Sequence, residues 1–425
     1  MMLVLISAAS CTDPAAAPFD RYVHGDTDCD GELTITDATE IQRLLVESPS
    51  EIFDRFASDF DSDGSITILD ASCIQRRIAE MDSDLLVHYS QMNSYTEEYL
   101  SMGDYADDDH SYSEMSGHIP EYRKMSSRPA PYLLDIPANG TLYLREGERP
   151  VSYQVEKGVF EIRNMTPGEE VTYLLKDEDG KRTKAGLLYP TGRVRMINGG
   201  GKTFNIRDLG GWDCDGGTLK YGLIFRGCEL SGDNYNVNIN DEQISLFRDF
   251  LGIRDEIDLR ADSEVDGVDN LYGTDDDIRD SVLGSKVTYI RYPVVPYAVG
   301  VNLGNSYQTK IYAALIKRVS RDIKDGKPCY IHCMAGADRT GTLCALIEAI
   351  CGVSLSDIEK DYELTSLSPE APRLRTSNEW KALVEYLNSF PGESFRDRVI
   401  CYAVRAGVST DEIKALRDGM IHKKI

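Results

Sequence analysis

The 425-residue sequence predicts a multidomain protein with a small helical module, a small β-sandwich-like segment and a C-terminal α/β domain whose central sheet is flanked by helices. Three observations support this division. An acidic motif occurs twice near the N-terminus, short alternating runs follow, and apolar strands then alternate with amphipathic helices. Because one core rarely serves more than about 250–300 residues, more than one domain is expected.

The composition excludes several classes of protein. Hydrophobic residues make up 41% of the chain and charged residues 28%, as in ordinary globular proteins. Acidic residues outnumber basic ones 71 to 46, so the formal net charge of −25 disfavours binding to nucleic acids and anionic lipids. The ten cysteines form no CxxC pair, and we expect neither a disulfide framework nor a zinc site.

Residues 1–19 are expected to be a truncated signal or lipoprotein-like segment. A short apolar run leads into Ser and Ala at positions 7–10, followed by Cys11, which resembles a lipoprotein cleavage box. The expected location is therefore extracellular or on a bacterial cell surface, with Cys11 as a candidate site for a lipid anchor. A disordered or mis-started N-terminus is the alternative, because a basic region is missing.

Residues 20–82 contain an internal repeat with a period of 33 residues. Each copy places carboxylates at alternate positions of a loop, then a glycine, then an aspartate at position 12, where a helix begins. This register surrounds a hard cation with oxygen ligands and predicts calcium binding. The expected ligands are Asp26, Asp28, Asp30, Glu32 and Asp37 in the first loop, and Asp59, Asp61, Asp63, Ser65 and Asp70 in the second.

The two loops together resemble a dockerin, an EF-hand-like module that docks onto the cohesin domains of extracellular scaffolds such as cellulosomes. The resemblance implies two structural calcium ions and a cohesin as partner. It also implies partner contacts from both repeats, at Ile35, Thr36, Gln42, Arg43, Ile68, Leu69, Gln75 and Arg76.

Two segments without assigned chemistry follow. Residues 83–130 are rich in Tyr, Ser, Met and Asp with little periodicity, which predicts a linker. Residues 131–198 contain alternating runs at 141–144, 151–155 and 171–175 between turn residues, which predicts a small β-sandwich that is similar to fibronectin type III or immunoglobulin-like domains.

The strongest chemical signal lies at residues 332–341 of the C-terminal domain, residues 199–425. An apolar strand ends at His332, a short loop follows, and Thr340 opens a helix. The amides of such a loop and helix N-terminus favour an anion, including the anionic sulfur of Cys333. Arg339, separated from Cys333 by five residues, carries a planar fork that matches two phosphate oxygens. We therefore expect Cys333 to be a nucleophile and Met334, Ala335, Gly336 and Ala337 to bind substrate.

This loop resembles the signature of the cysteine-based protein tyrosine phosphatase superfamily, and residues 200–420 resemble its bacterial tyrosine and lipid phosphatase branch. The matching blocks are 205–211, 222–226 with Glu229 and Leu230, 257–260 with Glu264, 332–341, and Asp361 with Tyr362. The resemblance implies that Cys333 attacks phosphorus to form a phosphocysteine, which water hydrolyses, without a cofactor for catalysis.

The resemblance also implies roles for the neighbours of the nucleophile. The general acid is expected just before the arginine, at Asp338, with Asp208 as a second candidate that alternatively bonds to a turn beneath the loop. His332 is expected to orient the Cys333 backbone. Thr340 is expected to donate a hydrogen bond to the Cys333 sulfur.

Three functions remain open from the sequence. Members of the branch that act on phosphoinositides often carry Lys where this chain has Ala337, so phosphotyrosine or a small phosphomonoester is the favoured substrate. The first alternative is an inositol-polyphosphate or phosphoinositide phosphatase that uses the same loop. The second is a non-catalytic phosphate-binding adaptor.

Overall fold

The computed structural model describes residues 23–48, 53–61, 65–79, 87–91, 96, 100, 129–147, 149–232, 235–261, 264–265, 280–294, 306–368 and 373–423. The chain divides into two compact units, one made of residues up to Gln91 with Pro131–Gly192, the other of Met92–Ala130 with Arg193–Ile425. The segment expected to carry a signal, including Cys11, lies outside the described residues, as does most of the expected linker. No helix among the described residues has the length and apolar character needed to cross a bilayer.

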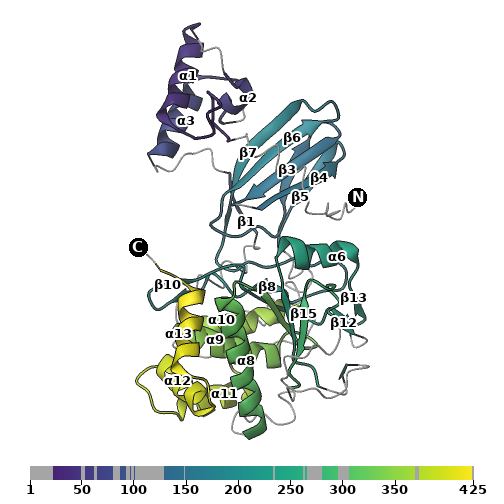
Figure 1. Cartoon of the computed structure of the whole chain (residues 1–425), viewed down its shortest axis with the longest axis vertical. Helices are drawn as coiled ribbons and strands as arrows, with labels where there is room; N and C mark the ends of the chain where they lie inside the picture. Colours follow the sequence, from purple (N-terminus) through teal and green to yellow (C-terminus); the bar gives the residue numbers. More distant parts are fainter. Residues whose placement is uncertain are drawn as a thin grey trace. The chain divides into compact units, whose positions relative to one another are not determined.

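The acidic repeat forms a pair of similar helices in the first unit (Figure 1). Its helices are α1 (Ile35–Leu45), α2 (Arg55–Ser58) and α3 (Ile68–Ile78). Helices α1 and α3 begin with the same reciprocal cap, in which a threonine hydroxyl and an aspartate carboxylate bond to backbone amides, at Thr34 with Asp37 and at Thr67 with Asp70. Each repeat therefore places its last acidic residue in the first turn of a helix.

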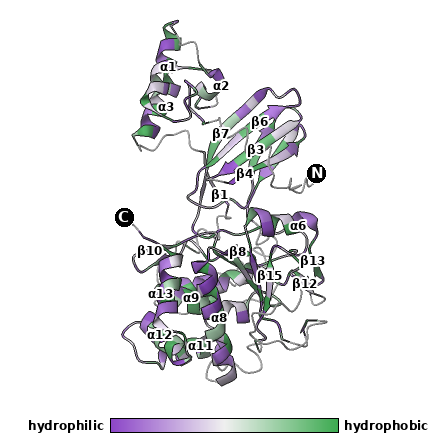
Figure 2. Cartoon of the chain, in the orientation of Figure 1, coloured by the Kyte–Doolittle hydropathy of each residue, from purple (hydrophilic) through white to green (hydrophobic). Residues whose placement is uncertain are grey.

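The remainder of the first unit is built from two sheets. The larger has the strand order β1-β7-β6-β3-β4, with β1 at Val87–Ser90, β3 at Gly140–Glu146, β4 at Arg149–Val155, β6 at Val171–Asp177 and β7 at Arg182–Thr191. The smaller pairs β2 (Tyr132–Ile136) with β5 (Gly158–Ile162). Side chains along β3 alternate between buried and half-buried positions, and Figure 2 shows the matching alternation of hydropathy along the strands. Strand β1, which comes from the expected linker, pairs with β7 in parallel.

The second unit is built around a five-stranded sheet with the order β15-β14-β16-β11-β8. Its strands are β8 (Arg207–Asp208), β11 (Ile224–Gly227), β14 (Asp255–Asp258), β15 (Thr288–Arg291) and β16 (Cys329–His332). All neighbours pair in parallel except β8 and β11. Two small sheets join β9 (Asp213–Cys214), β10 (Gly217–Leu219) and β17 (Ile421–Lys423), and β12 (Ser231–Gly232) with β13 (Val237–Asn238).

Helices cover both faces of this sheet (Figure 1). On one face lie α8 (Ser306–Lys324), α9 (Asp338–Cys351), α10 (Leu355–Glu363), the 3-10 turn Leu364–Leu367, α11 (Asn378–Asn388), α12 (Phe395–Arg405) and α13 (Thr410–Met420). The other face is covered by α6 (Asp241–Ser245), which continues into a π-helical turn at Leu246–Phe250.

Helix α9 is the centre of the larger core. Leu343, Leu346, Ile347 and Ile350 are fully buried and belong to the larger apolar core. The helix begins at Asp338, two residues before the expected Thr340. Because β16 is the middle strand and α9 is enclosed by other helices, the loop between them is held at both ends.

Candidate active site

The loop at residues 333–337 leaves the carboxyl end of the central strand β16 and enters α9. Ligands of open α/β sheets bind at the carboxyl ends of the strands. Cys333, the first residue of the loop, is 3% exposed. The expected nucleophile therefore lies where such sheets place their reactive groups.

Four consecutive carbonyl groups of this loop accept hydrogen bonds from fixed partners. In order, Met334 accepts from the Glu229 amide at 2.9 Å, Ala335 from Asn205 Nδ2 at 2.9 Å, Gly336 from Arg226 Nη2 at 2.8 Å and Ala337 from the Gly341 amide at 2.8 Å. In a trans peptide group the C=O and the following N–H point in opposite directions. Each carbonyl points toward its partner, so the amide that follows it points away from that partner and can bind an anion.

Gly336 is required at its position for two reasons. Its φ of +67° is a conformation that residues with a Cβ rarely adopt. A Cβ added there would also lie 2.1 Å from the Gly227 carbonyl oxygen. The loop can therefore approach strand β11 this closely only with glycine.

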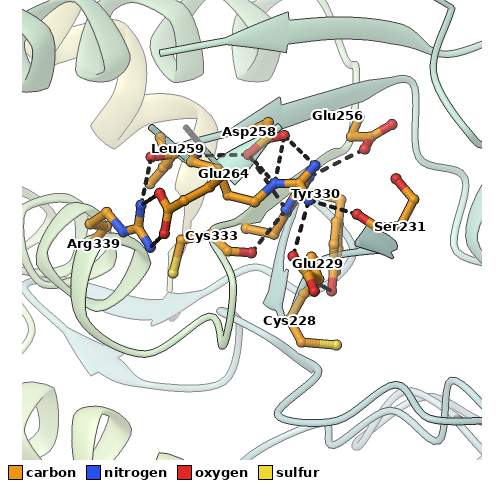
Figure 3. A network of polar contacts seen from close by, with 12 residues as sticks. Cys228, Glu229, Ser231, Glu256, Asp258, Leu259, Glu264, Tyr330, Cys333 and Arg339 are labelled. Atoms are coloured by element: carbon orange, nitrogen blue, oxygen red, sulfur yellow. Dashed lines mark hydrogen bonds and ion pairs between the residues drawn. The ribbon is translucent and has the colours of Figure 1, made fainter. Parts of the chain in front are cut away.

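Arg339 is buried and held by Glu264. Its Nη1 donates to Glu264 Oε2 at 2.5 Å and its Nη2 to Oε1 at 3.0 Å. Figure 3 shows the two groups facing each other, with the Cys333 sulfur on the Arg339 side of the network and the Cys228 sulfur at the far end. Burial by itself lowers the pKa of Arg339, but Cys333 and Glu264 raise it, and the net shift is upward. The expected cation and the expected nucleophile are thus brought together.

His332 lies beneath the loop and is fully buried. Its Nδ1 is 3.2 Å from the Cys333 carbonyl oxygen, and its Nε2 is 3.2 Å from Glu256 Oε1. Because a carbonyl only accepts, Nδ1 is the donor in the first contact. This contact fits the expected role of His332 in orienting the Cys333 backbone.

The expected bond from Thr340 to the nucleophile is not formed. The Thr340 side chain is fully buried, and its hydroxyl makes no hydrogen bond among the described residues. The hydroxyl is a buried donor, and leaving such a group without an acceptor costs free energy.

The two candidates for the general acid have different surroundings. Asp338 is partly exposed and bound by Arg373, whose Nε and Nη2 donate to its two oxygens at 2.6 and 2.9 Å. Asp208 is fully buried and accepts from the amides of Gly210 at 2.9 Å and Gly222 at 2.7 Å. Burial raises the pKa of Asp208, and Arg195 with the two amides counters part of that shift. The surroundings of Asp208 match its alternative role of holding a turn.

A buried carboxylate, Asp361, ties helix α10 to two strands. It accepts from Arg207 Nε of β8 at 2.7 Å and from Arg226 Nη1 of β11 at 2.5 Å. Burial raises the pKa of Asp361, but the two guanidinium groups lower it, and the net shift is downward. Since Arg226 also donates to the Gly336 carbonyl, Asp361 fixes one of the donors that shape the loop.

The sequence contains no local pattern for the roles of Glu264, Asp361 and Arg373. The first two stand in blocks that resemble the phosphatase branch, which is the available signal for them. Arg373 stands in none of these blocks, and its contact with Asp338 joins residues 35 positions apart.

The acidic loops of the first unit bring carboxylates together. Ligand oxygens of Asp26, Asp28 and Asp30 lie within 4.8 Å of one another, as do those of Asp59, Asp61 and Asp70. Burial and the neighbouring carboxylates raise the pKa of Asp26 and of Asp28. Such a group of oxygens fits a hard cation, which would relieve the repulsion.

The other expected ligands are placed differently. Asp37 accepts from the amide of Thr27 at 2.6 Å and from that of Thr34 at 2.7 Å. Glu32 and Ser65 are exposed at their loops, and Asp63 lies outside the described residues.

Comparison with known families agrees with both halves of the chain. A model of the dockerin type I domain matches residues 24–79, so the first unit contains a dockerin, a domain type that binds calcium and a cohesin partner. No curated protein matches the chain. A model described as tyrosine phosphatase family matches residues 201–421, which is more than half of the sequence and includes the loop between β16 and α9. The chain belongs to the tyrosine phosphatase family.

Proposed function

We propose that the protein hydrolyses phosphomonoesters through a phosphocysteine intermediate, with phosphotyrosine as the preferred substrate. Two observations at the loop of residues 333–337 carry this proposal. The carbonyl groups of residues 334–337 accept hydrogen bonds from fixed partners, which leaves the following amides pointing in the opposite direction. Arg339 lies beside Cys333. A tetrahedral anion is the ligand that such an arrangement of amides and guanidinium fits.

The proposed reaction has two steps. The Cys333 sulfur attacks phosphorus, the ester P–O bond breaks, and Asp338 gives its proton to the leaving oxygen. Water then attacks phosphorus, Asp338 takes a proton from it, and the S–P bond breaks to release inorganic phosphate. In both steps Arg339 donates two hydrogen bonds to the oxygens that gain charge.

An aryl phosphate is favoured over polyphosphorylated or lipid substrates. Ala337 supplies no cation beside the loop, and the formal net charge of −25 repels highly anionic ligands. A phosphotyrosine residue carries one phosphate on an apolar ring. It therefore needs no additional cation beside the loop and is repelled less than a polyphosphorylated ligand.

The dockerin attaches this activity to a scaffold of the cellulosome type in the proposal. Ile35, Ile68 and Leu69 are 57%, 53% and 60% exposed, so the expected contact residues offer apolar surface to a cohesin. We place the protein outside the cell for this reason, with Cys11 as a candidate anchor.

The test compares substrates on the full chain. A phosphotyrosine peptide should be hydrolysed at least tenfold faster than phytate, and Cys333→Ser should abolish turnover of both while still binding vanadate or phosphate. Preferred hydrolysis of phytate would favour the inositol-polyphosphate alternative. Turnover that persists in Cys333→Ser would contradict the phosphocysteine mechanism.

A further inference from the structure

Asp338 is bound by an arginine from a distant part of the chain. Both nitrogens on one side of the Arg373 guanidinium donate to it, Nε to Oδ1 at 2.6 Å and Nη2 to Oδ2 at 2.9 Å. A two-pronged pair of this kind fixes the orientation of a carboxylate as well as its place. The side chains are 20% and 29% exposed, so the pair lies at the edge of the solvent.

The segment that carries Arg373 is itself anchored to the end of helix α10. The Arg373 amide donates to Ser366 Oγ at 2.9 Å, and that hydroxyl donates back to the Arg373 carbonyl oxygen at 2.9 Å. Two residues on, Arg375 donates to Glu363 from its amide at 2.9 Å and from Nη2 at 2.8 Å. The backbone that carries Arg373 is thus held by hydrogen bonds, which restricts the positions that its side chain can take beside Asp338.

A phenol also contacts the Asp338 carboxylate. Tyr362 of α10 lies with its hydroxyl 3.5 Å from Asp338 Oδ1, and burial raises the pKa of Tyr362, so this hydroxyl stays a donor. Two elements, α10 and the segment after it, therefore hold the same carboxylate.

We infer that Arg373 is a positioning residue that holds Asp338 in the orientation needed for proton transfer to the leaving oxygen and from water. The inference rests on the proposed function, in which Asp338 protonates the leaving oxygen and then accepts a proton from water. Proton transfer by a placed side chain contributes roughly 10²–10⁴-fold to a rate, and it needs the group within hydrogen-bonding reach. An aspartate at the first position of α9 has several rotamers, and the guanidinium selects one of them.

The test is a double-mutant cycle on the full chain with two small substrates. Arg373→Gln, Asp338→Asn and the double variant are compared with wild type on phenyl phosphate, whose leaving group needs a proton, and on p-nitrophenyl phosphate, whose leaving group needs it less. Arg373→Gln should lower kcat on phenyl phosphate by about 10–100-fold, with KM little changed and a smaller loss on p-nitrophenyl phosphate. In the Asp338→Asn background the same change should have little further effect.

Two further variants control the cycle. Arg373→Lys, which keeps the charge but not the fork, should recover part of the loss. Arg396→Gln removes a half-buried arginine that pairs with Asp215 and Asp397, and it should leave kcat unchanged.

Each other result overturns a stated idea. Equal losses from Arg373→Gln with and without Asp338, or a raised KM at constant kcat, would make Arg373 a ligand of substrate and would overturn the inference. Unfolding of both Arg373 variants would show a purely structural role and would overturn it too. Full turnover in Cys333→Ser would instead overturn the proposed function.

Discussion

Arg339 meets Glu264 through both ends of its guanidinium, so its orientation is set within the protein itself. Lysine would keep the charge but would lose the planar fork that can bind two phosphate oxygens together. We expect Arg339→Lys to lower kcat/KM for p-nitrophenyl phosphate by on the order of 10²–10³-fold, as loss of a transition-state donor does elsewhere. Steady-state kinetics measures this, and a loss smaller than threefold would contradict the assigned role.

Two glycines with nearly the same φ allow a matched comparison. Gly336 has a φ of +67° and a close approach to Gly227, whereas Gly326 has a φ of +65° and open space where a Cβ would stand. Gly326→Ala should cost about 1–2 kcal/mol of unfolding free energy from backbone conformation and leave turnover intact. Gly336→Ala should cost more and should also abolish most turnover, because the loop must move from β11.

Urea unfolding and turnover of the two alanine variants decide the point. If both variants lose the same stability and neither loses turnover, the close approach at Gly336 has no role in shaping the loop.

Residues with a local chemical pattern could be predicted from the sequence, and residues defined by distant contacts could not. The spacing of Cys333 and Arg339 indicates a phosphate-binding loop because both residues lie in one continuous segment that runs from a strand through a loop into a helix. Glu264 and Arg373 act through contacts that join 75 and 35 positions of the chain, and no periodicity reports such contacts.

Helix α9 carries an acidic residue in the middle of the core. Glu348 is 1% exposed, and neither carboxyl oxygen has a hydrogen-bond partner among the described residues. Burial and the nearby Asp361 raise the pKa of Glu348 well above its ordinary value of 4.5, although Arg226 and Arg207 act in the opposite direction. The folded protein therefore favours the protonated form of Glu348 more than the unfolded chain does.

This shift makes stability depend on pH in a defined direction. Because the folded pKa is raised, the contribution of Glu348 is fully favourable below about pH 4.5 and is lost as the pH rises toward the folded pKa. Gln cannot ionise in either state. The unfolding free energy of Glu348→Gln should therefore rise relative to that of wild type as the pH increases from 4 to 8. Urea unfolding at the two pH values measures this, and a difference that does not change with pH would contradict it.

Secondary structure in the second unit follows sequence patterns closely, and one strand of the first unit does not. The sequence patterns predict helices at 307–323, 355–364, 379–390, 395–406 and 410–420 and buried strands at 254–259 and 286–292. The structure has α8, α10 to α13, β14 and β15 there, to within a few residues. Strand β1 lies in a stretch expected as linker, because its pairing with β7 joins residues about 100 positions apart.

The whole molecule combines a calcium-binding domain and a phosphatase-family domain in separate compact units. Removing calcium with EDTA should leave the clustered carboxylates of the first unit in mutual repulsion. We expect a lower melting temperature for one calorimetric transition and no change in turnover of p-nitrophenyl phosphate. Asp28→Asn should reproduce part of the shift without EDTA.

Loss of turnover on chelation would contradict the assignment of calcium to the dockerin alone. An unchanged melting profile in EDTA would contradict the expected ligand groups of both loops.

The hydrogen bonds that fix the carbonyl groups of residues 334–337 affect the rate of substrate binding. Because this backbone is already immobilised, it loses little conformational entropy when an oxyanion binds. Substrate binding therefore requires no slow induced fit. Association should then be governed by diffusion and by the electric field of an acidic surface, and rising ionic strength should accelerate it for dianionic esters.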